Sequence, residues 1–288
     1  MSTTTATFGR HETFPLRYAW LTKGLEALRQ QPDIFAQPEQ AMVALGVGRN
    51  MVSAIHYWLQ VVGVAELTPT AGRITPLGEA LLGPNGDPYL EDEASLWIIH
   101  WLIASNAQQA TGFFWFFNQF ALPRFREDEL RVSLSEFVTQ HLQLKRAQST
   151  LKSDCSTLLR MYTPASGRNE DHLDSPLAHL SLIESDVNRY YHSPRRVRPF
   201  LPALALHFAL IHCFNADPQP SALPIRTLLY ADYGGAAPGA VFRLNEEGLM
   251  QALTQVLHDY PGCYELRDTA GVHQLYRVRD LGDPLQWL

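Results

Sequence analysis

The segment A-L-G-V-G-R-N-M-V-S-A-I-H-Y-W-L, residues Ala44–Leu59, decides the fold of the N-terminal part of the chain. Gly46 suits a tight turn between two helices, because a residue without a side chain adopts such a turn at little cost. Val52 and Ile55 follow at a spacing that directs both side chains into a three-helix core. This pattern predicts a helix-turn-helix.

Helices surround this motif and a hairpin follows it. The spacing of apolar residues predicts three helices, over residues 16–29, 39–45 and 49–62. Two short extended runs then flank T-P-T-A-G-R between Val64 and Ile74, which favours a two-stranded wing. Three helices followed by such a hairpin predict a winged helix.

The middle of the chain is strongly aromatic. The runs W-I-I-H-W-L and G-F-F-W-F-F-N-Q-F, both within residues 91–121, are apolar nearly all round, which is typical of buried helices. His100, inside the first run, is expected to be a hydrogen-bonded core histidine. Amphipathic helices are predicted over residues 127–141 and 147–162, and the polar residues 163–174 are a predicted linker.

The C-terminal part repeats the order of helices and a hairpin. Helices are predicted over residues 202–214, 225–230 and 246–259, and strands over residues 264–267 and 274–277. We therefore expect a mainly α protein with small β wings. Its parts are an N-terminal winged-helix domain (residues 1–83), a central aromatic helical bundle (residues 84–165) and a C-terminal winged-helix-like domain (residues 175–288).

The composition is that of a globular protein, with 46% hydrophobic and 18% charged residues. The net charge of −6 argues against binding nucleic acid through a global positive field, so any phosphate-binding surface must be a local patch. No Cys-x-x-Cys spacing supports a zinc site, and motifs of ATPases and common hydrolases are absent from the sequence. Without a signal-peptide pattern or a long apolar segment, we expect a soluble cytoplasmic protein and no membrane partner.

The predicted third helix carries polar side chains on its outer face. Arg49, Asn50, Ser53 and His56 are groups that can contact base edges or phosphates, and Arg73 at the wing tip could reach the DNA backbone. The alternative is a winged helix used for protein contact, because a fold alone does not determine a function.

A second basic cluster lies in the C-terminal half. The run S-P-R-R-V-R-P contains Arg195, Arg196 and Arg198 and follows Tyr190 and Tyr191, which together suit contacts to a nucleic acid. A solvated loop or a loop that binds an acidic protein would explain the same residues.

The segment before the first predicted helix concentrates charged groups. Arg10, His11, Glu12, Arg17 and Lys23 could supply the base and the cations that phosphodiester chemistry uses. The alternative is structural: Glu12 or the residue after it caps the helix, while the later cations lie on its solvated face.

The string D-P-Y-L-E-D-E contains the carboxylates of Asp87, Glu91 and Asp92, which are candidate ligands of a divalent metal, Mg²⁺ in a nicking enzyme. Acidic residues at the start of a helix are also favoured by the helix dipole. The structural interpretation therefore competes with the metal site.

The motifs H-E-T-F-P-x-R-x-x-W-L-x-K-G, L-G-V-G-R-N-M-V-x-x-I-x-Y-W-L, T-P-L-G and D-P-Y-L-E-D-x-x-x-L-W-x-x-H-W-L occur in this order. With the later D-S-P-L-A-x-L-x-L-I and V-F-R-L-N-E, the chain resembles the domain-of-unknown-function family numbered four thousand and seven. That family is similar to the SspB-type DNA-nicking proteins of bacterial single-strand DNA phosphorothioation and antiphage defence systems.

The resemblance implies a DNA-nicking protein that works beside a cysteine desulfurase, an ATPase and an ATP pyrophosphatase. Those partners place sulfur where a non-bridging phosphate oxygen was. Two alternatives stay open: a non-catalytic winged-helix adaptor or transcription regulator, with the aromatic block as a dimer or partner interface, and an assembly protein that does not itself bind DNA.

Overall fold

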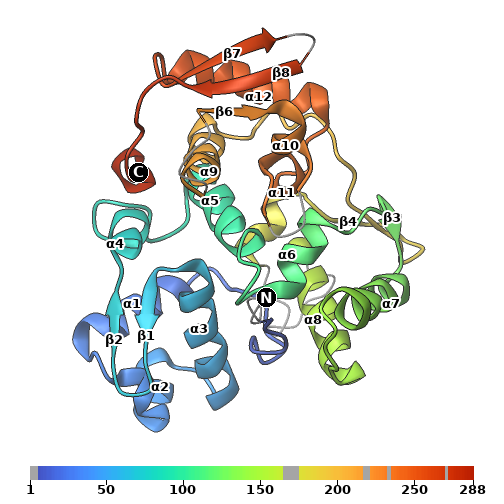
Figure 1. The fold of residues 1–288 in the computed structure, drawn as a ribbon. Coiled ribbons are helices and arrows are strands. Elements are labelled where there is room, and N and C mark those ends of the chain that lie inside the picture. Colours follow the sequence, from blue (N-terminus) through green and yellow to red (C-terminus); the bar gives the residue numbers. More distant parts are fainter. Residues whose placement is uncertain (1–5, 165–174, 217–220, 232–234, 270–271) are drawn as a thin grey trace.

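The computed structural model describes residues 6–164, 175–216, 221–231, 235–269 and 272–288 (Figure 1). Helices dominate the fold, and three small antiparallel sheets accompany them. The predicted class, mainly α with small β elements, is therefore confirmed. The predicted linker lies outside the described residues except for Thr163 and Pro164.

The N-terminal part has the predicted order of elements. It comprises α1 (Trp20–Gln30), the short 3-10 helix Ile34–Ala36, α2 (Pro38–Leu45), α3 (Arg49–Val62), β1 (Ala65–Leu67), β2 (Gly72–Ile74) and α4 (Pro76–Leu82). Strands β1 and β2 pair antiparallel, with Glu66 opposite Arg73. Gly46 and Gly63 end α2 and α3 in the left-handed conformation, at φ +66° and +77°, where a side chain would be strained.

The first helix begins later than the sequence predicts, at Trp20. The preceding residues form turns, in which Glu12 and Thr13 adopt positive φ values of 50° and 68°. Ala19 precedes the helix and no side chain caps it. The capping alternative for Glu12 and its neighbour is therefore wrong, because a tertiary contact holds this segment away from the helix.

The aromatic block forms two helices at the centre of the molecule, α5 (Glu93–Ala104) and α6 (Thr111–Asn118) (Figure 1). Their aromatic side chains are buried within the chain rather than exposed as an interface. His100 is fully buried and bonds Tyr162 Oη at 2.8 Å and the Val241 carbonyl at 2.9 Å, as expected of a core histidine.

A mixed layer follows the central helices. It comprises β3 (Arg124–Phe125), α7 (Glu127–Glu136) with a π-helical turn at Phe137–His141, α8 (Gln148–Tyr162), the 3-10 helix Pro176–Leu180, β4 (Glu184–Ser185) and β5 (Tyr191–His192). The strands form an antiparallel sheet in the order β3-β5-β4. The π-helical turn extends α7 over the whole length of the predicted helix.

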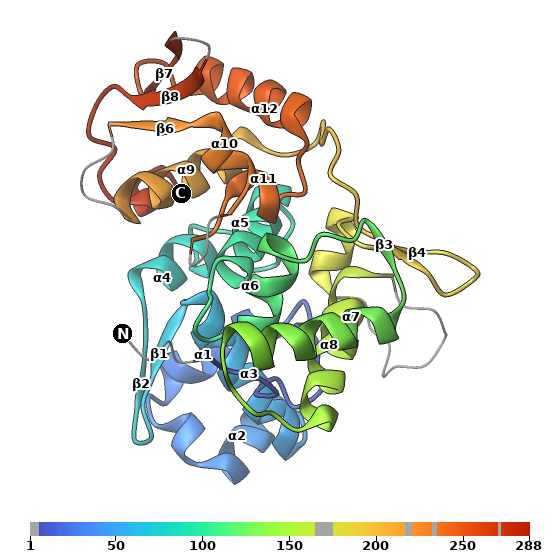
Figure 2. The same cartoon turned by 45° about the vertical axis from the view of Figure 1, so that its right-hand side comes forward.

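The C-terminal part lies on the other side of the central helices (Figure 2). It comprises α9 (Ala203–Ala216), β6 (Ala222–Pro224), α10 (Ile225–Leu229), α11 (Pro238–Val241), α12 (Glu246–Asp259), β7 (Tyr264–Thr269), β8 (Val272–Arg277) and the 3-10 helix Pro284–Trp287. Its sheet has the order β6-β8-β7, so β6 adds a strand to the predicted hairpin.

One hydrophobic core runs through these parts, from Leu16 to Leu281. Helix α5 joins them, because it contacts both α3 and α9. The division into three domains stays a prediction. Among the described residues, no helix combines the length and the hydropathy needed to cross a bilayer.

Candidate nucleic-acid interface

The charged segment before α1 and the outer face of α3 meet in one cleft of about 670 Å³. Arg10 and Glu12 line it from the segment, and Arg49, Ser53 and His56 line it from α3. From the sequence alone, the residues of the segment were predicted to be catalytic and those of α3 were predicted to contact DNA. The fold places them around the same space, which we call the N-terminal cleft.

His56 is the histidine that lines this cleft. Its side chain is partly buried and packs edge-on against the Phe35 ring, with centroids 5.5 Å apart. Burial lowers the pKa of His56, and the charge of Arg10 lowers it further. The cleft therefore presents a neutral imidazole that is able to accept a proton.

Arg49 is the other cation of the cleft. It is exposed and lies 3.8 Å from Glu39, a long ion pair between exposed side chains. Such pairs contribute little energy, so Arg49 can turn to another anion at small cost. Asn50 is also exposed at the start of α3 but does not line the cleft.

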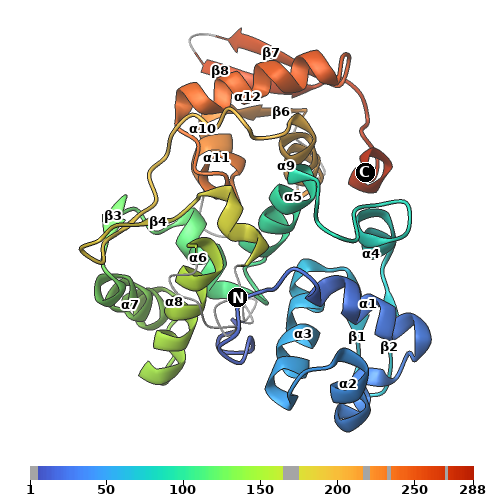
Figure 3. The same ribbon diagram turned by 180° about the vertical axis from the view of Figure 1, so that it is seen from behind.

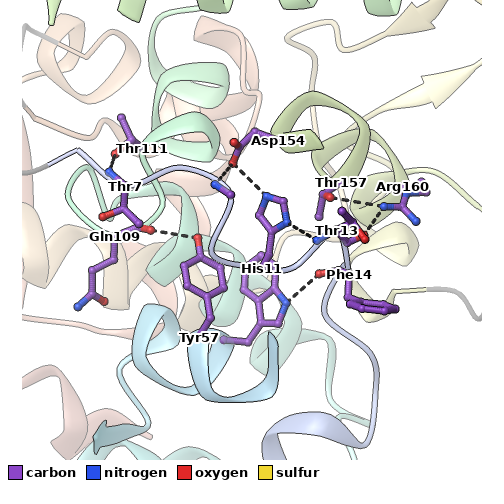
Figure 4. A network of polar contacts seen from close by, with 12 residues as sticks. Thr7, His11, Thr13, Phe14, Tyr57, Gln109, Thr111, Asp154, Thr157 and Arg160 are labelled. Atoms are coloured by element: carbon purple, nitrogen blue, oxygen red, sulfur yellow. Dashed lines mark hydrogen bonds and ion pairs between the residues drawn. The ribbon is translucent and has the colours of Figure 1, made fainter. Parts of the chain in front are cut away.

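His11 is fully buried and is not among the residues that line the cleft; Figure 4 shows its polar contacts. Its Nδ1 accepts the Thr13 backbone N–H at 3.2 Å, so the neutral ring carries its proton on Nε2 and donates it to Asp154 Oδ1 at 3.0 Å. The ring also stacks on Trp58 of α3. His11 therefore joins the N-terminal segment to α3 and α8, and does not face the cleft.

Further hydrogen bonds fasten the same segment (Figure 4). Asp154 Oδ1 also accepts the Gly9 N–H at 3.2 Å, Trp58 Nε1 donates to the Phe14 carbonyl at 3.1 Å, and Arg160 donates to the Thr13 carbonyl. Arg10 and Glu12 alternate with Gly9, His11 and Thr13, which these hydrogen bonds hold in place. We call this set of bonds the clamp; it sets where the Arg10 and Glu12 side chains enter the cleft.

Asp154 was not among the residues singled out from the sequence. A signal was present: in α8 it follows Leu151 by three residues and precedes Leu158 by four, so it falls on the buried stripe of the helix. A carboxylate on an apolar stripe needs a partner, because burying an unpaired charge is costly. His11, 143 positions away in the chain, supplies it.

Two predicted catalytic cations lie away from the cleft. The Arg17 guanidinium packs over the Phe14 and Trp20 rings, at 5.8 and 5.3 Å from their centroids. Lys23 is exposed on α1. Neither lines the N-terminal cleft.

Arg73, at the predicted wing, is exposed on β2 and pairs with Glu66 on β1 at 2.6 Å. Glu66 is the residue directly opposite in the strand register. The cation at the wing is thus partly neutralised by its neighbour on the same hairpin.

The basic loop of the C-terminal half is held mainly by the protein itself. Arg195 donates to the Leu229 carbonyl at 2.6 Å and packs over the Tyr230 ring, Arg196 pairs with Glu184, and Arg198 donates to the Ser181 carbonyl at 2.9 Å. Burial and the neighbouring Arg196 lower the pKa of Arg198 to about 10.

The three candidate metal ligands lie at the loop before α5. Both oxygens of Asp87 accept backbone N–H groups, of Glu91 and Asp92 at 2.9 Å each, and Asp92 caps α5 through the Ala94 N–H at 2.8 Å. Within the described ranges, no group of at least three His, Cys, Asp or Glu side chains is arranged to hold a metal ion. The carboxylates of Asp87 and Asp92 thus accept local backbone N–H groups, and the assignment of the three residues as metal ligands stays a prediction.

Comparison with known proteins places this geometry in a family. Two solved structures, described as a magnesium ion-bound SspB crystal structure and an SspB crystal structure, superpose with TM-scores of 0.83 and 0.84 at 26% sequence identity. The alignments cover 94% and 99% of this chain, and 83% and 86% of the SspB chains. No curated protein sequence matches.

A family model, the protein of unknown function DUF4007, matches residues 8–287. The resemblance to SspB-type proteins that the sequence motifs carry is therefore confirmed over nearly the whole chain, and the chain belongs to the DUF4007 family.

Proposed function

We propose that this chain is a DNA-binding component of a bacterial DNA phosphorothioation and antiphage defence system, in which it nicks one strand so that sulfur can be incorporated. The likeness to SspB supports the system, and the N-terminal cleft supports the DNA contact. The single observation that carries the proposal is that Arg10, Arg49 and His56 surround one cleft.

The order of elements supports a winged-helix mode of binding. Helices α1 to α3 precede the β1–β2 hairpin, and α3 presents Arg49, Ser53 and His56 at its exposed side. In this mode α3 approaches the DNA, and Arg73 at the hairpin contacts the backbone once it exchanges Glu66 for a phosphate.

The chemistry of a nick fits the pair formed by Arg10 and His56. Hydrolysis forms a bond from a water oxygen to phosphorus and breaks one phosphodiester P–O bond. The neutral His56 imidazole would accept the water proton, Arg10 would stabilise the pentavalent phosphate, and the departing sugar oxygen would take a proton from solvent. No step of this proposal is assigned to a metal ion.

A plasmid assay tests the nick. Supercoiled plasmid is incubated with the wild type in two parallel reactions, one with and one without Mg²⁺. The plasmid is expected to become open circular in both. Arg10→Gln and His56→Gln are expected to reduce the rate at least about tenfold, the lower end for a lost acid–base or charge-stabilising group. Arg226→Gln, an exposed cation far from the cleft in the fold, is the matched control.

A second function is favoured by a specific observation. His11, one of the predicted catalytic residues, is fully buried and does not line the cleft, which suits a non-catalytic DNA-binding adaptor. If the wild type leaves the plasmid supercoiled in both reactions yet shifts a labelled duplex at low salt, the adaptor is correct and the nicking enzyme is not. The desulfurase, ATPase and pyrophosphatase partners, and a homodimer, stay proposals that pull-down and light scattering can test.

A further inference from the structure

A second groove, of about 980 Å³, lies between α7, α8 and the loop joining β4 to β5. It is lined by four cations, Arg126, Arg131, Lys152 and Arg189, and we call it the basic groove. None of these residues was singled out from the sequence. They come from three elements that only the fold brings together (Figure 1).

The cations of the basic groove are not neutralised by ion pairs. In the part of the chain that the structure describes, the ion pairs within 4.0 Å include none of the four. This contrasts with the arginines of the 193–199 loop, which bond to carbonyl groups or to Glu184. The basic groove therefore retains its charge for a ligand.

Three carboxylates also line the groove, and other groups of the protein stabilise their negative charge. Asp186 accepts hydrogen bonds from the backbone of Asn188 at 2.8 Å and Tyr190 at 3.0 Å and from His192, which lower its pKa. Glu127 and Asp128 lie in the first turn of α7, where the helix dipole favours negative charge. By formal charge the four cations outnumber these three carboxylates, so the groove keeps a net positive charge.

Tyr190 contacts Arg126, a cation of the basic groove, and Arg124, which does not line the groove. Arg124 and Arg126 flank the buried Phe125, so the alternation of a strand directs both to the opposite side. Their guanidinium carbons lie 3.6 and 4.4 Å from the Tyr190 ring centroid. Cation–π contacts hold the two charges in place, which reduces the entropy lost when they bind an anion.

Helix α8 connects the basic groove to the N-terminal cleft. Lys152 lines the groove, and Asp154, two residues later, holds the segment that carries Arg10. In the view from behind, the N-terminal segment runs between α3 and α8 (Figure 3). The basic groove and the N-terminal cleft are therefore connected through α8.

We propose that the basic groove binds the phosphate backbone of the same DNA whose target site occupies the N-terminal cleft. The inference rests on the proposed function and adds a second contact to it. Arginine and lysine side chains from several elements suit a polymer with regularly spaced phosphates, and DNA affinity gained this way falls with salt as counterions are released.

The test uses the full chain and a fluorescently labelled DNA duplex of about 30 base pairs. Anisotropy titrations over a range of salt concentrations compare the wild type with the double variant Lys152→Gln/Arg189→Gln, whose side chains are both exposed. We expect at least about fivefold weaker binding at low salt and a log–log salt slope shallower by about 2, roughly one unit per lost phosphate contact.

Matched variants separate the possible outcomes. Arg226→Gln/Arg267→Gln removes two exposed cations outside both clefts, and Lys152→Arg/Arg189→Lys keeps the charges; both are expected to bind like the wild type.

Three outcomes would decide against the inference. If Lys152→Gln/Arg189→Gln binds DNA normally while Arg10→Gln does not, the inference fails and the proposed function stands. If the wild type binds no DNA at low salt, both fail. If Lys152→Gln/Arg189→Gln binds DNA normally but loses affinity for a poly-glutamate peptide, the groove binds an acidic protein instead.

Discussion

His11 Nε2 lies 3.0 Å from Asp154 Oδ1, and both side chains are buried. The bond joins residues 143 positions apart and fixes the segment that brings Arg10 and Glu12 into the N-terminal cleft. The chemistry that this segment supplies thus depends on a histidine and an aspartate that themselves stay inside the protein.

Replacing Asp154 by alanine is expected to destabilise the protein and weaken DNA binding. The substitution leaves the buried His11 Nε2–H without an acceptor, which costs about 1–3 kcal/mol of unfolding free energy. Urea unfolding measures this loss. Asp154→Asn, which keeps an acceptor oxygen, is expected to retain more of the stability, and Asp128→Ala, at an exposed carboxylate, is the control. Equal stability of Asp154→Ala and Asp128→Ala would contradict the clamp.

Gly46 and Gly48 offer a matched test of the turn before α3. A Cβ at either position meets nothing within 4 Å, but only Gly46 has a positive φ, of 66°. Gly46→Ala is therefore expected to cost about 1–2 kcal/mol of stability through backbone strain alone, and Gly48→Ala to change it by less than about half that amount. Thermal or urea unfolding of the two variants checks the difference; similar losses would rule out the left-handed turn.

Because His100 is buried, the folded protein is expected to lose stability in acid. Burial lowers the pKa of this histidine to about 3 in the folded protein, whereas it is about 6.5 when unfolded. Below pH 6.5 the unfolded state takes up a proton that the folded state does not. The contribution of the neutral, buried His100 to the free energy of unfolding is therefore complete above pH 6.5 and declines toward pH 3. The slope reaches at most about 1.4 kcal/mol per pH unit.

The measurement is the urea midpoint between pH 7.5 and 5. His100→Gln is expected to be less stable at neutral pH but to show a flatter dependence on pH than the wild type. An unchanged pH profile in His100→Gln would show that other groups, such as His207, whose pKa burial lowers to about 4, account for the acid sensitivity.

Arg243 tests how the core tolerates a buried charge. It is 3% exposed, donates to the Phe116 carbonyl at 2.9 Å, and burial lowers its pKa to about 9. Since desolvation opposes the charge, Arg243→Met is expected to stay within about 1 kcal/mol of the wild type. Arg243→Ala, which leaves a cavity, is expected to lose at least about 2 kcal/mol. Equal losses in both variants would assign a stabilising role to the charge itself.

The sequence predicted the parts of the fold that local signals determine. Helix α3 has the predicted bounds, because the glycines around it mark its ends. The start of α1 was predicted too early, since helical spacing from Leu16 onward does not reveal that His11 bonds to α8. Such a contact depends on which distant residue faces the segment, and periodicity carries no information on that pairing.

The same distinction explains the candidate site. Arg49, Ser53 and His56 were found because they share a helix face, which spacing predicts. Their meeting with Arg10 was not predicted, and neither was the basic groove, whose cations come from separate elements. The loop at residues 193–199 shows the reverse: its arginines looked available in the sequence, but the fold supplies Glu184 and backbone carbonyl groups as their partners.

Affinity for a labelled DNA duplex at low salt decides whether the N-terminal cleft binds DNA. Arg10→Gln/Arg49→Gln is expected to bind at least about tenfold more weakly than the wild type, with the salt slope reduced by about 2, while Arg226→Gln/Arg267→Gln binds normally. Wild-type affinity and an unchanged salt slope in Arg10→Gln/Arg49→Gln, with the fold intact by circular dichroism, would contradict the assignment of this cleft to DNA.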